Sequence, residues 1–182
     1  MTADEARALL EKIAAGSEQA LNRFYQDHSN RVYNFAYKRL NNTVDAAEVL
    51  NQVMMDVWCN AGRFEGRSKV TTWLLGITHH KVIDILRKRG RNPGEELPGD
   101  PEDENTPTAM DIMLREQDAV HIRTCLERLS DNHRQVVHMV FFEEIPYSEI
   151  AQIMDCPEGT VKTRMFHAKQ CLKRCLSKLL RN

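Results

Sequence analysis

The strongest constraint on this chain lies in its last third, where two helical segments are separated by a short break. Residues 148–154 carry apolar side chains at helical spacing, and the break at 155–158 contains Pro157, which disfavours helical angles at the residue before it. A second helical pattern follows, and Thr160 is its expected N-cap, with its hydroxyl accepting from the backbone N–H of Thr163. Two helices joined by so tight a turn predict a helix-turn-helix.

The second helix of this pair is predicted to be basic and amphipathic. Its apolar stripe has three- and four-residue spacing and consists of Val161, Met165, Ala168, Leu172 and Leu176. Residues 157–182 hold seven Lys or Arg against one acidic residue, although the net charge of the whole chain is −1. A basic second helix is typical of DNA-binding proteins, in which that helix lies in the major groove. The sequence therefore predicts a nucleic-acid partner.

The first turns of the second helix hold the candidates for DNA contacts. The residues assigned to base edges are Lys162, Thr163, Phe166 and His167. Lysine donates to guanine O6 and N7, and phenylalanine packs on the methyl group of thymine. Arg164 and Lys169 are assigned to phosphates, which add salt-dependent affinity without sequence choice. The alternative reading of this face is an ordinary basic helix in contact with water.

The rest of the chain also has helical periodicity, and no segment alternates convincingly like a strand, so the predicted fold class is all-α. The expected helices span about 3–14, 17–40, 43–61, 71–89, 113–129 and 132–143. We expect Thr43 to cap the third of these helices, Thr71 or Thr72 the fourth, and Ser130 or Asp131 the last.

An acidic segment divides the chain into two parts. Residues 91–118 hold nine acidic residues against two arginines, and four prolines lie within 91–110. Such a composition cannot bury enough apolar surface to become ordered, which predicts a flexible linker. We therefore expect two small helical domains, at 1–90 and 113–182, joined by a linker at 91–112.

Several classes of protein lack support in this sequence. The five cysteines form no CxxC pair, so we expect free thiols in a cytoplasmic protein. There is no secretory signal and no run of the roughly 20 apolar residues that a membrane span requires. A glycine-rich phosphate loop, a nucleophile elbow and an HExxH motif are all absent. We therefore expect neither enzymatic activity nor a cofactor.

One helical face carries three residues that are common metal ligands. His167, Cys171 and Cys175 repeat every four residues, which is compatible with a zinc or redox site. A single straight helix cannot close three ligands around a tetrahedral metal, and no fourth ligand lies nearby in the sequence. We favour ordinary structural roles and predict no metal, and a metal or redox sensor built on this face stays an alternative.

Two ordered sets of short motifs span most of the chain. The first half contains Leu21-Asn22-Arg23-Phe24-Tyr25, Val32-Tyr33-Asn34-Phe35-Ala36, Asp45-Ala46-Ala47-Glu48, Val57-Trp58, Thr72-Trp73-Leu74 and Asp84-Ile85-Leu86-Arg87-Lys88. The second half contains Leu129-Ser130, Val136-Val137, Phe141-Phe142-Glu143, Tyr147-Ser148-Glu149-Ile150-Ala151 and Gly159-Thr160-Val161-Lys162-Thr163-Arg164. With both sets in this order, the chain resembles a group IV, or extracytoplasmic-function, sigma factor of bacterial RNA polymerase in the sigma-70 superfamily.

The resemblance implies a promoter-specificity subunit. In that family the N-terminal domain, region 2, docks on the clamp coiled coil of polymerase and opens the −10 element of the promoter. The C-terminal domain, region 4, reads the −35 element and touches the flap, and the linker threads towards the RNA exit path. The implied partners are the RNA polymerase core, promoter DNA and an anti-sigma factor, without insertion into a membrane.

The resemblance also places the strand-opening surface on the loop before the fourth helix and on that helix. The residues assigned to the −10 element are Phe64, Ser68, Trp73, His80, Lys81, Arg87 and Lys88. Capture of an unstacked base offsets an unstacking free energy of a few kcal/mol. Trp73 is either a stacking face or a core residue that supports the loop. His80 is a departure, since the family usually has an asparagine there, and this changes the expected base preference.

A further set of residues is assigned to the polymerase core. These residues are Asp45, Glu48, Gln52, Asp56 and Trp58. Asp45, Glu48 and Gln52 share one helical face. The family is usually more acidic at the positions of Ala47 and Gln52, so we expect weaker binding to the core than in a typical member. Outside this family, the reading that stays open is a helix-turn-helix regulator with a helical sensor half.

Overall fold

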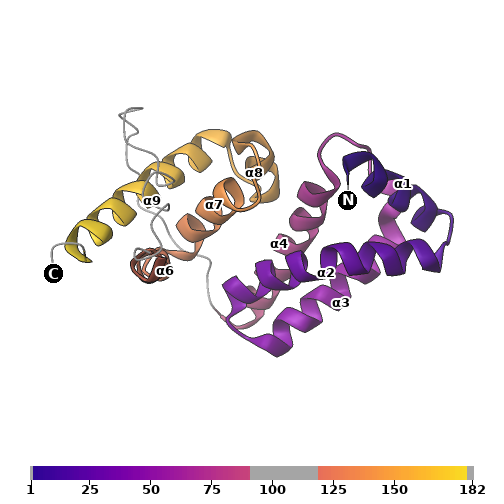
Figure 1. Ribbon diagram of the computed structural model, residues 1–182, viewed down its shortest axis with the longest axis horizontal. Helices are drawn as coiled ribbons and strands as arrows, with labels where there is room; N and C mark the ends of the chain where they lie inside the picture. The colour runs from indigo at the N-terminus through magenta and orange to yellow at the C-terminus, as the bar shows by residue number, and fades with distance from the viewer. Residues whose placement is uncertain (1, 91–118, 180–182) are drawn as a thin grey trace. The chain divides into compact units, whose positions relative to one another are not determined.

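The computed structural model describes residues 2–90 and 119–179, and every regular element within them is a helix (Figure 1). The predicted all-α fold is therefore confirmed. The chain folds as two compact units, one N-terminal and one C-terminal. The predicted linker at 91–112 lies outside the described residues, so the domain bounds stay a prediction. In the two described ranges no helix has the length and apolar character needed to cross a bilayer.

The N-terminal unit is a bundle of helices around one apolar core. Its elements are α1 (Ala3–Ala14), α2 (Glu18–Leu40), α3 (Thr43–Asn60), the 3₁₀ helix η1 (Ala61–Arg63) and α4 (Val70–Lys88). The long helix α2 packs against α1, α3 and α4 and lies alongside α3 (Figure 1). The core side chains Phe24, Val32, Val53 and Leu74 are fully buried and come from three different helices. Burial of these stripes therefore fixes which faces of α3 and α4 stay exposed.

The helix starts in this unit agree with the sequence at α2 and differ by one residue at α3. Ser17, at the start of the predicted 17–40 helix, is the N-cap of α2. At α3 the cap is Asn42, and the prediction of Thr43 is wrong. The Oδ1 atom of Asn42 accepts from the backbone N–H groups of Val44 and Asp45, at 2.9 and 3.1 Å. Asparagine satisfies two of the four unpaired donors at the helix start, so Thr43 becomes the first helical residue.

The start of α4 also differs from the prediction. The helix begins at Val70, so neither Thr71 nor Thr72 is its cap, and Lys69 occupies the N-cap position without a side-chain hydrogen bond. Val70 and Thr72 are buried, at 4% and 5% exposed. Burial of the first turn thus determines where this helix begins, in preference to a capping hydroxyl.

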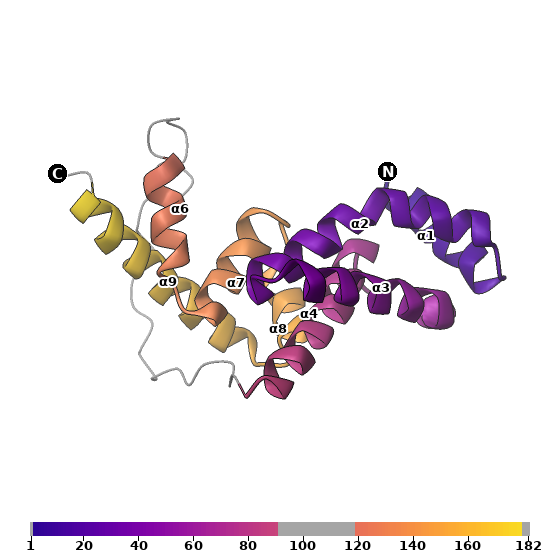
Figure 2. The ribbon, with the colours of Figure 1, turned by 90° about the horizontal axis from the view of Figure 1, so that it is seen from below.

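The C-terminal unit is organised around one long helix. Its elements are α6 (Ala119–Glu127), α7 (Asp131–Phe141), α8 (Tyr147–Ile153) and α9 (Glu158–Leu179). The helix α9 packs against both α6 and α7 (Figure 2). Ser130 caps α7, because its hydroxyl accepts from the backbone N–H of His133 at 3.4 Å. Residues 113–118 of the predicted 113–129 helix lie outside the described residues.

The predicted pair of helices joined by a tight turn is confirmed as α8 and α9, with an earlier start for the second helix. The turn includes Asp155 at φ 49°, a left-handed conformation that Asp tolerates better than most residues. The carbonyl of Pro157 accepts from the backbone N–H groups of Thr160 and Val161, at 2.9 and 3.4 Å. Thr160 therefore lies inside the first turn, and its prediction as the N-cap is wrong.

The buried histidine of α2 makes the stability of this unit depend on pH. His28 is 4% exposed and lies 4.3 Å from Phe24 between ring centroids. Burial, helped by the charge of Arg31, lowers the pKa of His28 from 6.5 to about 4. Between about pH 6.5 and pH 4 the histidine of the unfolded chain is protonated, whereas His28 in the folded chain stays neutral. The stability that is fully present above about pH 6.5 is therefore lost as the pH falls towards and through about 4.

We therefore expect the urea midpoint of the full chain to fall between pH 7 and pH 4.5. The His28→Leu variant, which has no titrating group at this position, should show a smaller fall over the same range. The measurement is urea unfolding followed by circular dichroism at both pH values. Equal falls in the two proteins would show that His28 does not carry this pH dependence.

Candidate nucleic-acid and polymerase interfaces

The helix α9 has one buried stripe and one basic face. The predicted apolar stripe is buried along its whole length, from Val161 to Leu176. Lys162, Phe166 and Lys169 are spaced by four and three residues, so they lie on one face. Lys162 is exposed and the other two are half-buried. The Nζ atom of Lys162 is 3.0 Å from Oε1 of Glu158 in an exposed pair, which is easily exchanged for another anion.

Three other predicted DNA-binding residues of α9 contact the protein itself. The hydroxyl of Thr163 donates to the carbonyl one turn earlier at 3.0 Å. The Nη1 atom of Arg164 is 3.7 Å from Sγ of Cys156 in the preceding turn. The ring of His167 lies 6.1 Å from the ring of His133 on α7. The structure therefore brings Lys162, Phe166 and Lys169 together on one face. Of the other residues, Thr163 bonds to the backbone of α9 itself, Arg164 contacts the preceding turn and His167 faces α7.

The loop before α4 is supported by two aromatic side chains. The ring centroids of Phe64 and Trp73 are 5.4 Å apart, and both residues are half-buried against the core. The hydroxyl of half-buried Ser68 donates to the adjacent backbone carbonyl at 3.4 Å. Gly66 has φ 71°, and a Cβ atom there would lie 3.3 Å from the guanidinium of Arg7. Trp73 thus supports the loop through Phe64, and part of its surface stays exposed.

The basic residues predicted for DNA on α4 differ in how they are paired. Lys81 Nζ is 2.8 Å from Oδ2 of Asp56 on α3. Arg87 Nη1 is 4.0 Å from the carboxylate three residues earlier in an exposed pair. His80 is exposed, and Lys88 is exposed and makes no ion pair with the part of the chain that the structure describes. Of the basic residues predicted for DNA on α4, Lys88 is therefore the most readily available to a phosphate.

A groove of about 400 Å³ between α3 and α4 brings predicted polymerase-binding and DNA-binding residues together. It is lined by Asp45, Glu48, Gln52, Lys81, Asp84, Ile85, Lys88 and Arg89. A guanidinium nitrogen of Arg89 donates to the carboxylate of Asp45, which is 17% exposed. Gln52 donates to Glu48 at 2.9 Å. The sequence did not indicate the Asp45–Arg89 pair, because 44 residues separate the two partners.

Two of the carboxylates predicted to bind polymerase are thus paired with basic side chains, one within α4 and one at its C-cap. Asp45 pairs with Arg89, and Asp56 pairs with Lys81. Partly exposed pairs of this kind contribute about 0–1 kcal/mol each, so a partner can replace them without a large penalty. The predicted core-binding Trp58 is half-buried and packs against the apolar core, so part of its surface supports α3.

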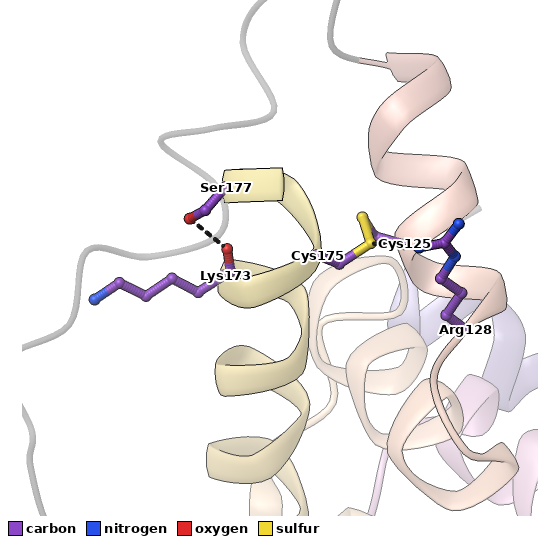
Figure 3. Close-up of a disulfide and its surroundings, with 5 residues drawn as sticks. All are labelled: Cys125, Arg128, Lys173, Cys175 and Ser177. Carbon is purple, nitrogen blue, oxygen red and sulfur yellow. Dashed lines mark hydrogen bonds between the residues drawn. A yellow bond between two sulfur atoms is a disulfide. The ribbon is translucent and has the colours of Figure 1, made fainter. Parts of the chain in front are cut away.

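The C-terminal unit contains a disulfide between Cys125 on α6 and Cys175 on α9 (Figure 3). The Cα atoms of the two residues are 5.7 Å apart, and 50 residues separate them in the chain. The prediction that all cysteines are free thiols is therefore wrong for this pair. The other three cysteines, Cys59, Cys156 and Cys171, keep their thiols. A separation of 50 residues carries no periodic signal, so the sequence could not indicate the pairing.

The disulfide also changes the reading of the His/Cys face of α9. Cys175 bonds to α6 and is not available as a ligand beside His167 and Cys171. In the residues that the structure describes, no group of three His, Cys, Asp or Glu side chains is arranged to hold a metal ion.

Comparison with known protein families identifies both halves of the chain. The model for Sigma-70 region 2 matches residues 24–92, and the model for Sigma-70, region 4 matches residues 120–172. The two matches follow the order of the regions in one family and together cover more than half of the chain.

Curated relatives agree over nearly the full length. The ECF RNA polymerase sigma factor SigK of Mycobacterium tuberculosis is 26% identical over 172 residues, which cover 93% of this chain and 92% of the relative. The RNA polymerase sigma-H factor of Pseudomonas aeruginosa is 24% identical over 190 residues, which cover 100% of this chain and 98% of the relative.

Solved structures support the same fold. The structure of CnrH in complex with the cytosolic domain of CnrY has a TM-score of 0.66 at 17% identity, and the match covers 96% of this chain and 98% of that chain. The sigma factor RpoE of Bartonella quintana, in complex with the anti-sigma factor NepR, has a TM-score of 0.62 at 21% identity, and the match covers 86% and 96%. The chain therefore belongs to the sigma-70 family, in its extracytoplasmic-function class, and its N-terminal half is region 2 and not a separate sensor domain.

The Asp45–Arg89 pair across the groove should be measurable as a coupling free energy. We expect the unfolding free energies of Asp45→Ala, Arg89→Ala and the double variant to give a coupling of about 0.2–1 kcal/mol in a double-mutant cycle. The exposed pair Arg7–Glu11 on α1, 3.4 Å apart, serves as the matched control and should give a coupling no larger. A coupling of zero at Asp45–Arg89 would show that this pair does not brace α3 against α4.

Proposed function

We propose that this protein is a promoter-specificity subunit that directs the bacterial RNA polymerase core to a defined set of promoters. It carries out no catalysis of its own. The observation that carries the proposal is the presence of regions 2 and 4 in order along one chain, each with a basic exposed helix face. Joining two weak DNA-binding units on one polymerase raises the effective concentration of the second unit once the first has bound.

Region 4 reads the −35 element through the outward face of α9. Lys162 lies one turn after the start of the helix, near the N-terminal end that comes closest to base edges in the major groove. Its ammonium donates to guanine, and Phe166 one turn later packs on a thymine methyl group. Lys169 lies further along the same face and contacts phosphate, which adds affinity without sequence choice. Thr163 and Arg164 complete the contacts from the edge of this face, and His167 holds the helix against α7.

Region 2 opens the −10 element with the loop before α4 and with α4 itself. A base that leaves the stack meets the exposed part of Trp73, whose position is set by Phe64. Ser68 on the loop and exposed His80 on α4 supply hydrogen-bonding groups beside this face. Lys81, Arg87 and Lys88 attract the phosphates of the separated strand.

Region 2 binds the polymerase core through α3. Glu48 is exposed and Gln52 is half-exposed, so they present a polar face for the clamp. Asp45 and Asp56 join this contact when their partners Arg89 and Lys81 exchange a carboxylate for a DNA phosphate. Binding to polymerase and binding to the promoter therefore favour each other. Polymerase that takes up the two carboxylates releases the basic side chains for DNA, and DNA that takes up the basic side chains releases the carboxylates for polymerase. Trp58 packs against the apolar core of the N-terminal unit and so helps to hold α3 in place.

We extend the proposal to control by an anti-sigma factor. Of the solved structures with this fold, RpoE is in complex with the anti-sigma factor NepR, and CnrH is in complex with the cytosolic domain of CnrY. An inhibitor that covers the exposed faces of α3 and α9 prevents contact with both polymerase and promoter.

The test of the proposed function is transcription with purified components. Core polymerase plus the full chain should start RNA at a defined site on a promoter selected from a randomised library, and core polymerase alone should not. The chain alone should bind the same duplex only weakly. If the chain neither associates with core polymerase nor raises run-off transcription above background from any library member, the proposal is wrong.

Replacement of two lysines of α9 should affect DNA binding in different ways, one through sequence discrimination and the other through overall affinity. Lys162→Ala should lower the discrimination between the preferred −35 sequence and a single-base variant by roughly 1–3 kcal/mol, because a base contact is lost. Lys169→Ala should weaken binding about equally on both sequences and reduce the salt slope by about one unit, because a phosphate contact is lost. Holoenzyme binding to both sequences at several salt concentrations measures both effects. A uniform loss for Lys162→Ala would contradict its assignment to a base.

A further inference from the structure

The helix α1 runs alongside η1 and the loop before α4. A Cβ atom on Gly62 of η1 would lie 3.7 Å from Cβ of Ala14. A Cβ atom on Gly66 of the loop would lie 3.3 Å from Nη1 and 3.5 Å from Cζ of Arg7. The first helix of the chain is thus a direct neighbour of the loop that we assign to strand opening, although none of the predicted site residues lies on this helix.

The apolar pattern of α1 explains why Arg7 stays at the surface. The side chains of Ala6, Leu10 and Ile13 have four- and three-residue spacing and are buried in the core of the N-terminal unit. Arg7 follows the first of these residues directly, and its side chain is 61% exposed. Burial of the stripe therefore holds the guanidinium at the edge of the bundle, beside Gly66 and in contact with water.

We propose that Arg7 is a further DNA-contacting residue, which binds the phosphate next to the base that leaves the stack at the −10 element. The inference rests on the proposed function, since it names one more contact of the same strand-opening surface. It extends that surface to α1, whereas the residues assigned so far lie on α4 and on the loop before it.

The first argument concerns the distance between the captured base and the basic residues already assigned to phosphates. Trp73 is the stacking face, and Lys81 follows it by eight residues, which is about 12 Å along α4. Arg87 lies about 21 Å from Trp73 along the same axis. A base that stacks on Trp73 carries its phosphates on its own sugar and on the next one, so they stay near the loop. The basic residues of α4 thus serve more distant phosphates.

The second argument concerns the charges around the loop. Arg67 forms an ion pair with Glu65 within the loop. Arg63 and Lys69 are exposed and make no ion pair with the residues that the structure describes. Together with Arg7, they leave a net positive charge beside the aromatic pair of the loop. Basic groups next to an aromatic face are the combination with which proteins bind single strands.

The third argument concerns the donors that Arg7 has available. Its Nε atom is 3.4 Å from Oε1 of Glu11 one turn later, and the side chains of both residues are mostly exposed. The pair uses Nε, whereas the terminal nitrogens Nη1 and Nη2 are the atoms beside Gly66. A guanidinium with these N–H groups available matches the oxygens of a phosphate. An exposed pair contributes little to stability, so a phosphate replaces the carboxylate readily.

Gly66 leaves room for the phosphate. Its φ of 71° suits glycine, and without a Cβ atom the guanidinium of Arg7 stays uncovered on this side. A side chain at this position would lie against Nη1 and block its donors. The glycine therefore provides access to Arg7 in addition to the backbone conformation of the loop.

The test uses holoenzyme and a single-stranded oligonucleotide that carries a −10 element selected with the wild-type chain. Arg7→Ala should weaken binding about two- to fivefold, the range of one exposed ionic contact. The salt slope should fall by about 0.7, because one phosphate contact to a single strand is lost. Arg7→Lys should keep the salt slope, and Arg7→Gln, which has no charge, should lose it. Wild-type affinity and slope in Arg7→Gln would show that Arg7 only packs against the loop.

Neutral methylphosphonate groups in the oligonucleotide locate the contact. One such group replaces one phosphate at a time and removes its charge. Next to the extruded base, on one side or the other, it should weaken the binding of wild type, and at the same position it should have no further effect on Arg7→Ala. If the two losses add at every position, Arg7 contacts none of these phosphates and the proposal is wrong.

The matched control is Arg23 on α2, whose side chain is 64% exposed and lies 3.1 Å from Asp27 in a similar ion pair. Arg23→Ala should keep the wild-type salt slope and the wild-type response to methylphosphonate. Glu11→Gln should bind the oligonucleotide more tightly than wild type, because no carboxylate then competes with the phosphate for Arg7. A loss in either control equal to that of Arg7→Ala would show that ion pairs within the helices support binding, and the proposal would fail.

The outcomes separate this inference from the proposed function. If wild-type holoenzyme neither binds the oligonucleotide nor starts RNA at a promoter, the proposed function fails and this contact fails with it. If wild type does both, and Arg7→Ala equals wild type in affinity and salt slope, the proposed function stands and the contact is refuted. Circular dichroism of Arg7→Ala checks that the variant is folded, as we expect for an exposed side chain.

Discussion

Burial of one apolar stripe on each long helix is the constraint on which both units depend. In α9 the stripe from Val161 to Leu176 faces inward, and this alone places Lys162, Phe166 and Lys169 on the outside. A rotation of the helix by one residue would bury charge, which is far more expensive than exposing part of an apolar side chain. The apolar residues that must be buried thus determine which face of α9 is exposed for binding.

Helical periodicity was sufficient to predict these stripes, the all-α fold and the tight turn before α9. The caps were harder to predict, because a capping hydroxyl competes with other groups. Asn42 accepts two backbone donors ahead of Thr43, and burial of Val70 sets the start of α4. The carbonyl of Pro157 accepts from the backbone N–H groups of Thr160 and Val161, so Thr160 lies inside α9 and is not its cap. Local propensity therefore predicts a helix well and its first residue poorly.

Contacts between residues far apart in the chain were beyond the reach of sequence patterns. The pairs Asp45–Arg89 and Cys125–Cys175 join helices across 44 and 50 residues. Both alter the chemistry of groups that were recognised individually, since a carboxylate assigned to polymerase is already paired with a guanidinium, and a cysteine considered as an alternative metal ligand is already bonded. Residue type predicted what each side chain can do, and only the fold shows which partner it has.

The backbone conformation of the loop before α4 restricts which residues the loop can hold more strongly at Gly66 than at its other positions. Gly66 holds a left-handed backbone beside the guanidinium of Arg7, so any larger residue there meets both an unfavourable φ and a crowded neighbour. Phe64 and Ser68 flank this position and His80 follows on the helix, and none of them carries such a restriction. Under the proposed assignment of these residues to the −10 element, promoter preference in descendants of this chain can therefore diversify by exchange of individual side chains, while the course of the main chain is inherited unchanged.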